Sequence, residues 1–219
     1  HMTRPFRRFE SPIERKLEES GKISERFLFG RARVESDDYI RDKNQLIERH
    51  RTCRQPIDFR EGAEIIKRAQ PFEPDRRVPQ DPTNPTKEFP RRLRAAVATA
   101  LGLGAVGSKR VFFFTAVDTF LDEDAGTDSL IEWQRTPGEP SKLVRLDFSR
   151  YPEDPAVSRE KEAARARIFA DLPPQVVIGE VPEVDDSRQL TDPGSVYNKF
   201  VDSVAREIAV ALQQPPATH

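Results

Sequence analysis

The order of apolar patterns along residues 88–213 constrains the fold of this chain most strongly. Four segments have the apolar or alternating pattern of β-strands: residues 110–117, 128–134, 142–149 and 175–181. Three segments have the periodicity of amphipathic helices: residues 89–103, 158–172 and 195–213. The predicted order is helix, three strands, helix, strand, helix. We therefore expect one α/β domain over residues 88–213.

The residues before this domain have a different character. Residues 3–70 predict a helical arm, with helix-capping signals at Ser11, Ser36 and Asp58. These helices carry few apolar residues, so they need a partner surface to stay folded. We expect a lid or interaction arm, which packs on the sheet, exchanges between subunits or binds a protein partner. The proline-rich residues 71–87 predict an extended linker or a surface strap.

Charge and cysteine content exclude several classes of protein. The net charge is −1, so no overall field attracts the chain to nucleic acid or membrane. Residues 4–54 are rich in arginine, and that region is either a phosphate-binding arm or a surface of mixed charge. Cys53 is the one cysteine, which excludes an internal disulfide and fits a reducing, cytoplasmic compartment. No apolar run approaches the length of a membrane span.

Two common catalytic signatures do not apply. Residues 102–107 (GLGAVG) have the spacing of a dinucleotide-binding loop, but the predicted helix precedes them and the strand follows. We interpret these glycines as a helix end and a loop. His50 is the one histidine away from the termini, so neither a histidine–metal cluster nor a Ser-His-Asp triad is expected. Hydrolytic chemistry in this chain would have to use carboxylates.

Two aspartates occupy suggestive positions. Asp128 begins the second predicted strand and Asp147 ends the third. If these strands pair as a hairpin, both carboxylates lie at the same end of the sheet, and Glu132 points to the same strand face as Asp128. Carboxylates a few ångströms apart bind Mg²⁺ or Mn²⁺, which lowers the pKa of a bound water. The alternative is structural, because aspartates at strand ends often form turns or helix caps.

The element order, with Gly126-Thr127-Asp128 opening one strand and Leu146-Asp147-Phe148-Ser149 ending the next, resembles the PD-(D/E)XK nuclease superfamily. This resemblance implies a restriction-endonuclease-like fold, a four-stranded mixed sheet flanked by helices. It assigns the first motif acid to Asp128 and the second to Asp147.

The resemblance also raises the question of a lysine and of further acids. Ser149 stands where the superfamily has a lysine that positions the attacking water. Lys142 or Lys161 would then supply that amine from elsewhere. Glu88 is the candidate for the acid on the preceding helix, and Glu132 is a further candidate metal ligand.

Two functional hypotheses follow. The first is a Mg²⁺- or Mn²⁺-dependent nuclease acting on DNA, or alternatively on RNA. The second is an inactive module with a nuclease-like fold, which uses its helical arm to bind a protein or nucleic acid. A different α/β fold remains a third alternative.

Overall fold

A mixed β-sheet forms the centre of the computed structural model, which describes residues 24–74, 76–149, 154–184 and 186–215. Its strands are β2 (Val111–Thr115), β3 (Ser129–Trp133), β4 (Lys142–Phe148) and β6 (Gln175–Ile178), in that spatial order. The first three strands are antiparallel neighbours, and β6 runs parallel to β4. The predicted α/β class, the four strands and the β3–β4 pairing are thus confirmed.

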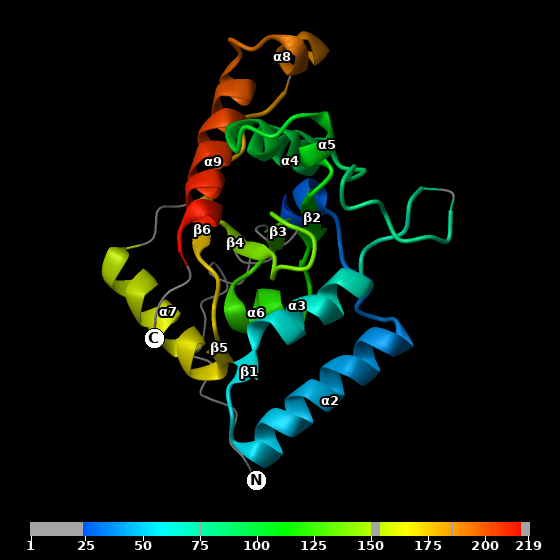
Figure 1. Cartoon of the computed structure of the whole chain (residues 1–219), viewed down its shortest axis with the longest axis vertical. Helices are drawn as coiled ribbons and strands as arrows, with labels where there is room; N and C mark the ends of the chain where they lie inside the picture. Colours follow the sequence, from blue (N-terminus) through cyan, green and yellow to red (C-terminus); the bar gives the residue numbers. More distant parts are fainter. Residues whose placement is uncertain (1–23, 75, 150–153, 185, 216–219) are drawn as a thin grey trace, which may run out of the picture.

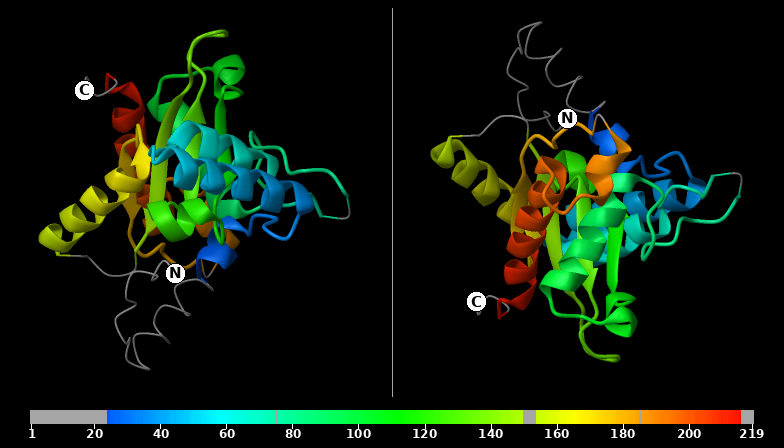
Figure 2. Two further views of the ribbon diagram at one scale, coloured as in Figure 1. Left: turned by 90° about the horizontal axis from the view of Figure 1, so that it is seen from below. Right: turned by 90° about the horizontal axis from the view of Figure 1, so that it is seen from above.

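One face of the sheet is covered by α4 (Glu88–Ala100) and α9 (Val196–Gln213). The two helices lie against each other and cross the strands (Figures 1 and 2). Leu93 and Val97 of α4 and Ile208 of α9 are fully buried in the core on this side. Both helices form because their apolar residues recur on one stripe, as expected for helices that pack on a sheet.

The opposite face is covered by α3 (Phe59–Arg68) and α6 (Phe120–Ala125), and α2 (Asp37–Cys53) packs on the outer side of α3. Ser36 and Asp58 cap α2 and α3 as predicted, because their side chains accept hydrogen bonds from Tyr39 N and Arg60 N. Buried residues of these helices share one core with Leu130 of β3 and Leu143 of β4. Among the alternatives for the helical arm, packing against the sheet is therefore the arrangement observed for α3, with α2 attached through α3. The capping signal at Ser11 lies outside the described residues.

A second, two-stranded parallel sheet joins distant parts of the chain. It pairs β1 (Ile57–Asp58) with β5 (Phe169–Ala170), which directly follows α7 (Pro155–Ile168). The helix predicted over residues 158–172 therefore ends earlier than expected, because Phe169 and Ala170 pair with β1 instead. Phe169 is buried and packs edge-on against Phe59.

The described residues of the proline-rich segment, 71–74 and 76–87, run over the surface beside the edge strand β2. Phe72 and Pro79 form an isolated antiparallel bridge. The carbonyl of Pro82 accepts a hydrogen bond of 2.9 Å from Phe113 N of β2. This contact pairs a backbone group on the sheet edge, where Gln70 also pairs both backbone groups of Thr115. The strap interpretation therefore describes this segment better than a free linker.

Three further helical pieces are short: a segment over residues 24–29, α5 (Ala105–Ser108) and α8 (Ser187–Thr191). Gly102 follows the end of α4 with a positive φ, as expected for a helix end. Within the part of the chain that the structure describes, no helix is both long and apolar enough to cross a membrane.

Candidate metal centre

Asp128 lies immediately before β3, between β2 and β4. Its backbone N–H donates to the carbonyl of Leu146, and its carbonyl accepts from Ala116 N, both at 2.8 Å. Its side chain is buried and accepts a hydrogen bond from the backbone N–H of Phe148. The neighbouring strands therefore hold this carboxylate in one position at the end of the sheet.

A second carboxylate comes from α6, in the connection between β2 and β3. Thr119 caps this helix by accepting from Leu121 N, and Gly126 ends it in the left-handed conformation. Asp122 lies in the first turn, where its Oδ2 accepts a hydrogen bond of 2.8 Å from Asp118 N. The short helix thus brings Asp122 close to Asp128.

The third carboxylate, Glu25, belongs to a helical segment over residues 24–29. Phe29 anchors this segment, because its buried ring packs among Phe89, Phe113 and Phe148 at centroid distances of 5.9, 6.1 and 6.3 Å. The next residue is also tied to the sheet, since Thr115 Oγ1 donates to the carbonyl of Gly30 (2.9 Å). Glu25 is therefore positioned by packing rather than by neighbours in sequence.

These three acids form one cluster. Single carboxylate oxygens of Glu25, Asp122 and Asp128 all lie within 4.8 Å of one another. Like charges at this separation repel each other strongly where water is excluded. Carboxylate oxygens are the ligands that Mg²⁺ and Mn²⁺ prefer, so the donor set fits a hard divalent cation. We refer to these three residues as the carboxylate cluster.

Electrostatics support the close approach of the acids. Burial raises the pKa of Asp128 well above its ordinary value, and the charge of Glu25 raises that pKa further. The hydrogen bond from Phe148 N opposes the rise, while the charges of Asp147 and Asp122 add to it. A divalent cation would reverse this preference, because it favours the ionised carboxylates.

Asp147 lies on the strand next to Asp128, and its side chain has its own partners. Gln175 of β6 donates from Nε2 to Asp147 Oδ2. Nη2 of Arg165, on α7, lies 4.0 Å from the same oxygen, and Nη1 of Arg165 donates to Gln175 Oε1 (3.2 Å). Asp147 is therefore held by an amide and lies near a guanidinium group. It is not one of the three clustered acids, but its charge raises the pKa of Asp128.

Two candidates from the sequence lie at the opposite end of the sheet. Glu132 is four residues along β3 from Asp128, which corresponds to roughly 13 Å. Its carboxylate pairs with Lys67 Nζ at 2.8 Å and accepts from Ser141. Lys142 is five residues from Asp147, roughly 17 Å along β4, and donates to the carbonyl of Gln214. The structure does not bring either residue to the carboxylate cluster.

The remaining candidates are distributed over three elements. Ser149 extends the β4–β6 pairing, since its N–H donates to the carbonyl of Ile178 (2.9 Å). Lys161 is an exposed residue of α7, four positions before Arg165. Glu88 forms ion pairs with Arg91 and Arg92 on α4, and is therefore neutralised on its own helix.

Sequence reasoning did not assign Glu25 or Asp122 to the site. Asp122 carried a local signal, because Thr119 and Asp122 have the spacing of a capping box and Gly126 is a natural helix end. Glu25 carried no such local signal, because the contacts of Phe29 that position it join residues far apart in the chain.

Comparison with known proteins adds no assignment: no family model, no curated protein and no solved structure matches the chain.

Proposed function

We propose that this protein is a Mg²⁺- or Mn²⁺-dependent nuclease that hydrolyses phosphodiester bonds in DNA. The observation that carries the proposal is the convergence of Glu25, Asp122 and the buried Asp128 within 4.8 Å. Their oxygens would hold the metal, with Asp147 beside them. The bound metal would lower the pKa of a water and offset the negative charge of the phosphate. RNA is the alternative substrate.

The position of the cluster supports access by a large substrate. Asp128 itself is buried, whereas Glu25 and Asp122 are partly exposed. A metal held between them would therefore have its protein ligands on the sheet side and solvent on the other. Mg²⁺ commonly keeps several coordination positions for water and phosphate oxygens, which suits such a half-open site.

The second candidate is a module that binds metal or DNA without cutting it. Ser149 favours this alternative, because a serine hydroxyl stands where the superfamily supplies a lysine amine. Two cations of α7 are candidates to position the attacking water in place of that lysine. They are Arg165, which lies near Asp147, and Lys161. Arginine stays protonated at neutral pH, so it can orient a water or bind a phosphate but does not remove a proton.

Cleavage assays test the proposal directly. Single-stranded and duplex DNA are incubated with Mg²⁺ or Mn²⁺ and with the wild type, Asp128→Asn or Glu25→Gln. We expect metal-dependent cleavage by the wild type and a loss of roughly a hundredfold or more in each variant. Glu123→Gln is the matched control, because Glu123 is an exposed acid next to Asp122 on α6.

The outcomes separate the two candidates. Equal cleavage by the wild type and Asp128→Asn would show that the activity comes from elsewhere and would reject the metal assignment. Metal binding by the wild type, measured by calorimetry, without cleavage of either DNA would favour the inactive module. Absence of both metal binding and cleavage would reject the metal centre altogether.

A further inference from the structure

Two arginines converge on one aspartate beside the carboxylate cluster. Arg26 donates to Asp118 from Nη2 and Nε, at 2.7 and 2.9 Å. Arg31 Nε lies 2.7 Å from Asp118 Oδ2. The aspartate side chain is only 10% exposed, whereas those of Arg26 and Arg31 are 47% and 53% exposed. The largely buried aspartate therefore binds both guanidinium groups, while about half of each arginine side chain is exposed to solvent.

This arrangement is directly connected to the carboxylate cluster. Arg26 follows Glu25 in the helical segment 24–29, and the N–H of Asp118 donates to Asp122. The hydrogen bond to Asp118 raises the pKa of Arg26, and burial opposes this rise. The charges of Asp118, Asp122 and Glu25 raise the pKa further. Arg26 therefore lies within the field of two cluster acids.

Asp118 adopts an unusual backbone conformation at this point. Its φ is +70°, in the left-handed region that residues other than glycine seldom occupy. The hydrogen bond from its N–H to Asp122 stabilises that conformation. Local strain of this kind persists where surrounding contacts maintain it, and it often accompanies binding sites.

We propose that Arg26 and Arg31, held by Asp118, bind a backbone phosphate of the DNA next to the one at the carboxylate cluster. This inference rests on the proposed function and identifies the side of the cluster along which the DNA strand lies. Two guanidinium groups share the single carboxylate of Asp118, and each is about half exposed. Arginine is well suited to phosphate, because its planar N–H groups match the geometry of the oxygens.

A purely structural role makes a different prediction. In that case the two ion pairs only attach residues 26–31 to the turn after β2. Removing either arginine would then lower the stability of the protein without changing how DNA binding depends on salt. Counterion release provides the distinction, because each phosphate contact adds a defined increment to the salt dependence of binding.

The experiment measures DNA binding by fluorescence anisotropy over a range of NaCl concentrations. Ca²⁺ replaces Mg²⁺, so that a carboxylate site is occupied while cleavage is avoided. The proteins are the wild type, Arg26→Gln, Arg31→Gln and the double variant, each with a labelled single strand and a labelled duplex. For each single variant we expect binding about tenfold weaker and a log–log salt slope shallower by about 0.7–0.9.

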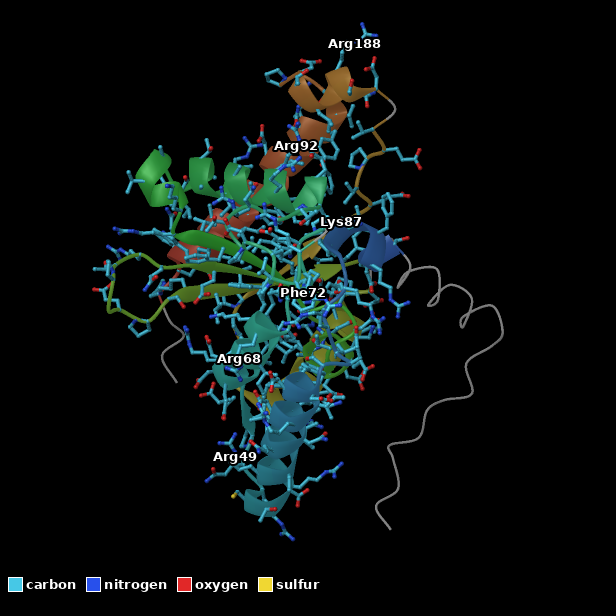
Figure 3. The ribbon with its side chains drawn as sticks, turned by 90° about the vertical axis from the view of Figure 1, so that its right-hand side faces the viewer. Arg49, Arg68, Phe72, Lys87, Arg92 and Arg188 are labelled. Atoms are coloured by element: carbon cyan, nitrogen blue, oxygen red, sulfur yellow. The ribbon has the colours of Figure 1, made fainter. Side chains whose placement is uncertain are left out.

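Arg49→Gln is the matched control. Its side chain is 56% exposed and also pairs with a carboxylate, Glu61. In Figure 3, Arg49 lies at the far end of α2 from Lys87, whose ammonium group lies over Phe27 of the helical segment. The control is expected to keep both the affinity and the salt slope of the wild type. Arg31→Lys, which retains the charge, is expected to keep most of the slope.

Several results would overturn the inference. One is a salt slope in the double variant that equals that of the wild type. Another is a loss of affinity and slope in Arg49→Gln as large as in the Arg26 and Arg31 variants. Circular dichroism establishes that each variant is folded. Where one glutamine variant is not folded, the other single glutamine variant supplies the salt slope. If the wild type does not cleave DNA but the arginine variants lose slope, the phosphate site stands and the proposed nuclease activity fails. If the wild type cleaves and these variants bind normally, the phosphate site fails.

Discussion

Gly126 and Arg165 lie so close together that a β-carbon on the glycine would fall 1.8 Å from Nη2 of the arginine. Gly126 ends α6 in the left-handed conformation, with φ +57°. Arg165 in turn contacts Gln175 and lies near Asp147. The absence of a side chain at one position therefore allows a guanidinium group to reach the edge of the candidate metal centre.

Replacing Gly126 with alanine is expected to destabilise the protein by about 1–2 kcal/mol. The left-handed backbone is unfavourable for alanine, and Arg165 must move away from Gln175. Urea unfolding of both proteins measures the difference. Gly104→Ala is the control, because nothing lies within 4 Å of a β-carbon there, and its effect is expected within about 0.5 kcal/mol. Equal effects of the two changes would contradict this account.

The raised pKa of Tyr39 leads us to expect that the protein loses stability at alkaline pH. Burial raises the pKa of this tyrosine from its ordinary value of 10 to about 12, and Phe120 N donates to its hydroxyl oxygen. Because the folded-state pKa lies above the unfolded value, the neutral phenol contributes stability that is fully present below pH 10 and is lost as the pH rises towards 12.

Tyr39→Phe removes this titration and also the acceptor for Phe120 N. We expect the variant to be less stable than the wild type at neutral pH by ~1 kcal/mol, with the difference shrinking above pH 10. Urea unfolding at a series of pH values measures both effects. A constant difference over the whole range would show that Tyr39 does not titrate as described.

Arg145 is an internal arginine whose removal is expected to be costly. Its side chain is 1% exposed; Nε donates to the carbonyl of Pro173, Nη1 to that of Ala125, and Nη2 pairs with Glu162. Arg145→Leu leaves these acceptors without a donor, so we expect a loss of about 3–5 kcal/mol. Glu162 is 40% exposed, and Glu162→Gln is expected to cost only ~1 kcal/mol. Chemical denaturation measures the free energy of unfolding of both variants. Equal losses in Arg145→Leu and Glu162→Gln would contradict this ranking.

Glu132 was expected from the sequence to bind metal, whereas the structure brings Glu25 to Asp128 in its place. Variants of these two acids therefore test which of them is a ligand. Glu132→Gln is expected to weaken the pair with Lys67 and to lower stability by ~1 kcal/mol, but to leave stabilisation by Mg²⁺ intact. Glu25→Gln is expected to reduce that stabilisation, which is about 2.7 kcal/mol at a hundredfold excess of metal over Kd. Thermal unfolding with and without Mg²⁺ measures both. If stabilisation by Mg²⁺ were lost in Glu132→Gln and kept in Glu25→Gln, the ligands expected from the sequence would be favoured instead.

Much of the architecture could be predicted because its signals are local. The four strands are short apolar or alternating runs, and Ser36, Asp58 and Ser195 cap helices through residues two or three positions away. The antiparallel pairing of β3 and β4 also followed from a short connection, and it places Asp128 and Asp147 on neighbouring strands. The small α6 helix was not predicted, although Thr119 and Gly126 marked both of its ends.

By itself, the sequence determined the four strands of the main sheet and the helices that pack on it in α3, α4 and α9. It also placed Asp128 and Asp147 at one end of the sheet, on the condition that their strands pair. Only the tertiary structure decided which other acids join them. Glu25 reaches Asp128 because Phe29 is buried against rings of α4, β2 and β4. This contact depends on burial between residues far apart in the chain, which periodicity and spacing do not encode. Glu132 lies too far along β3 to join Asp128, and there Lys67 of α3 pairs with it.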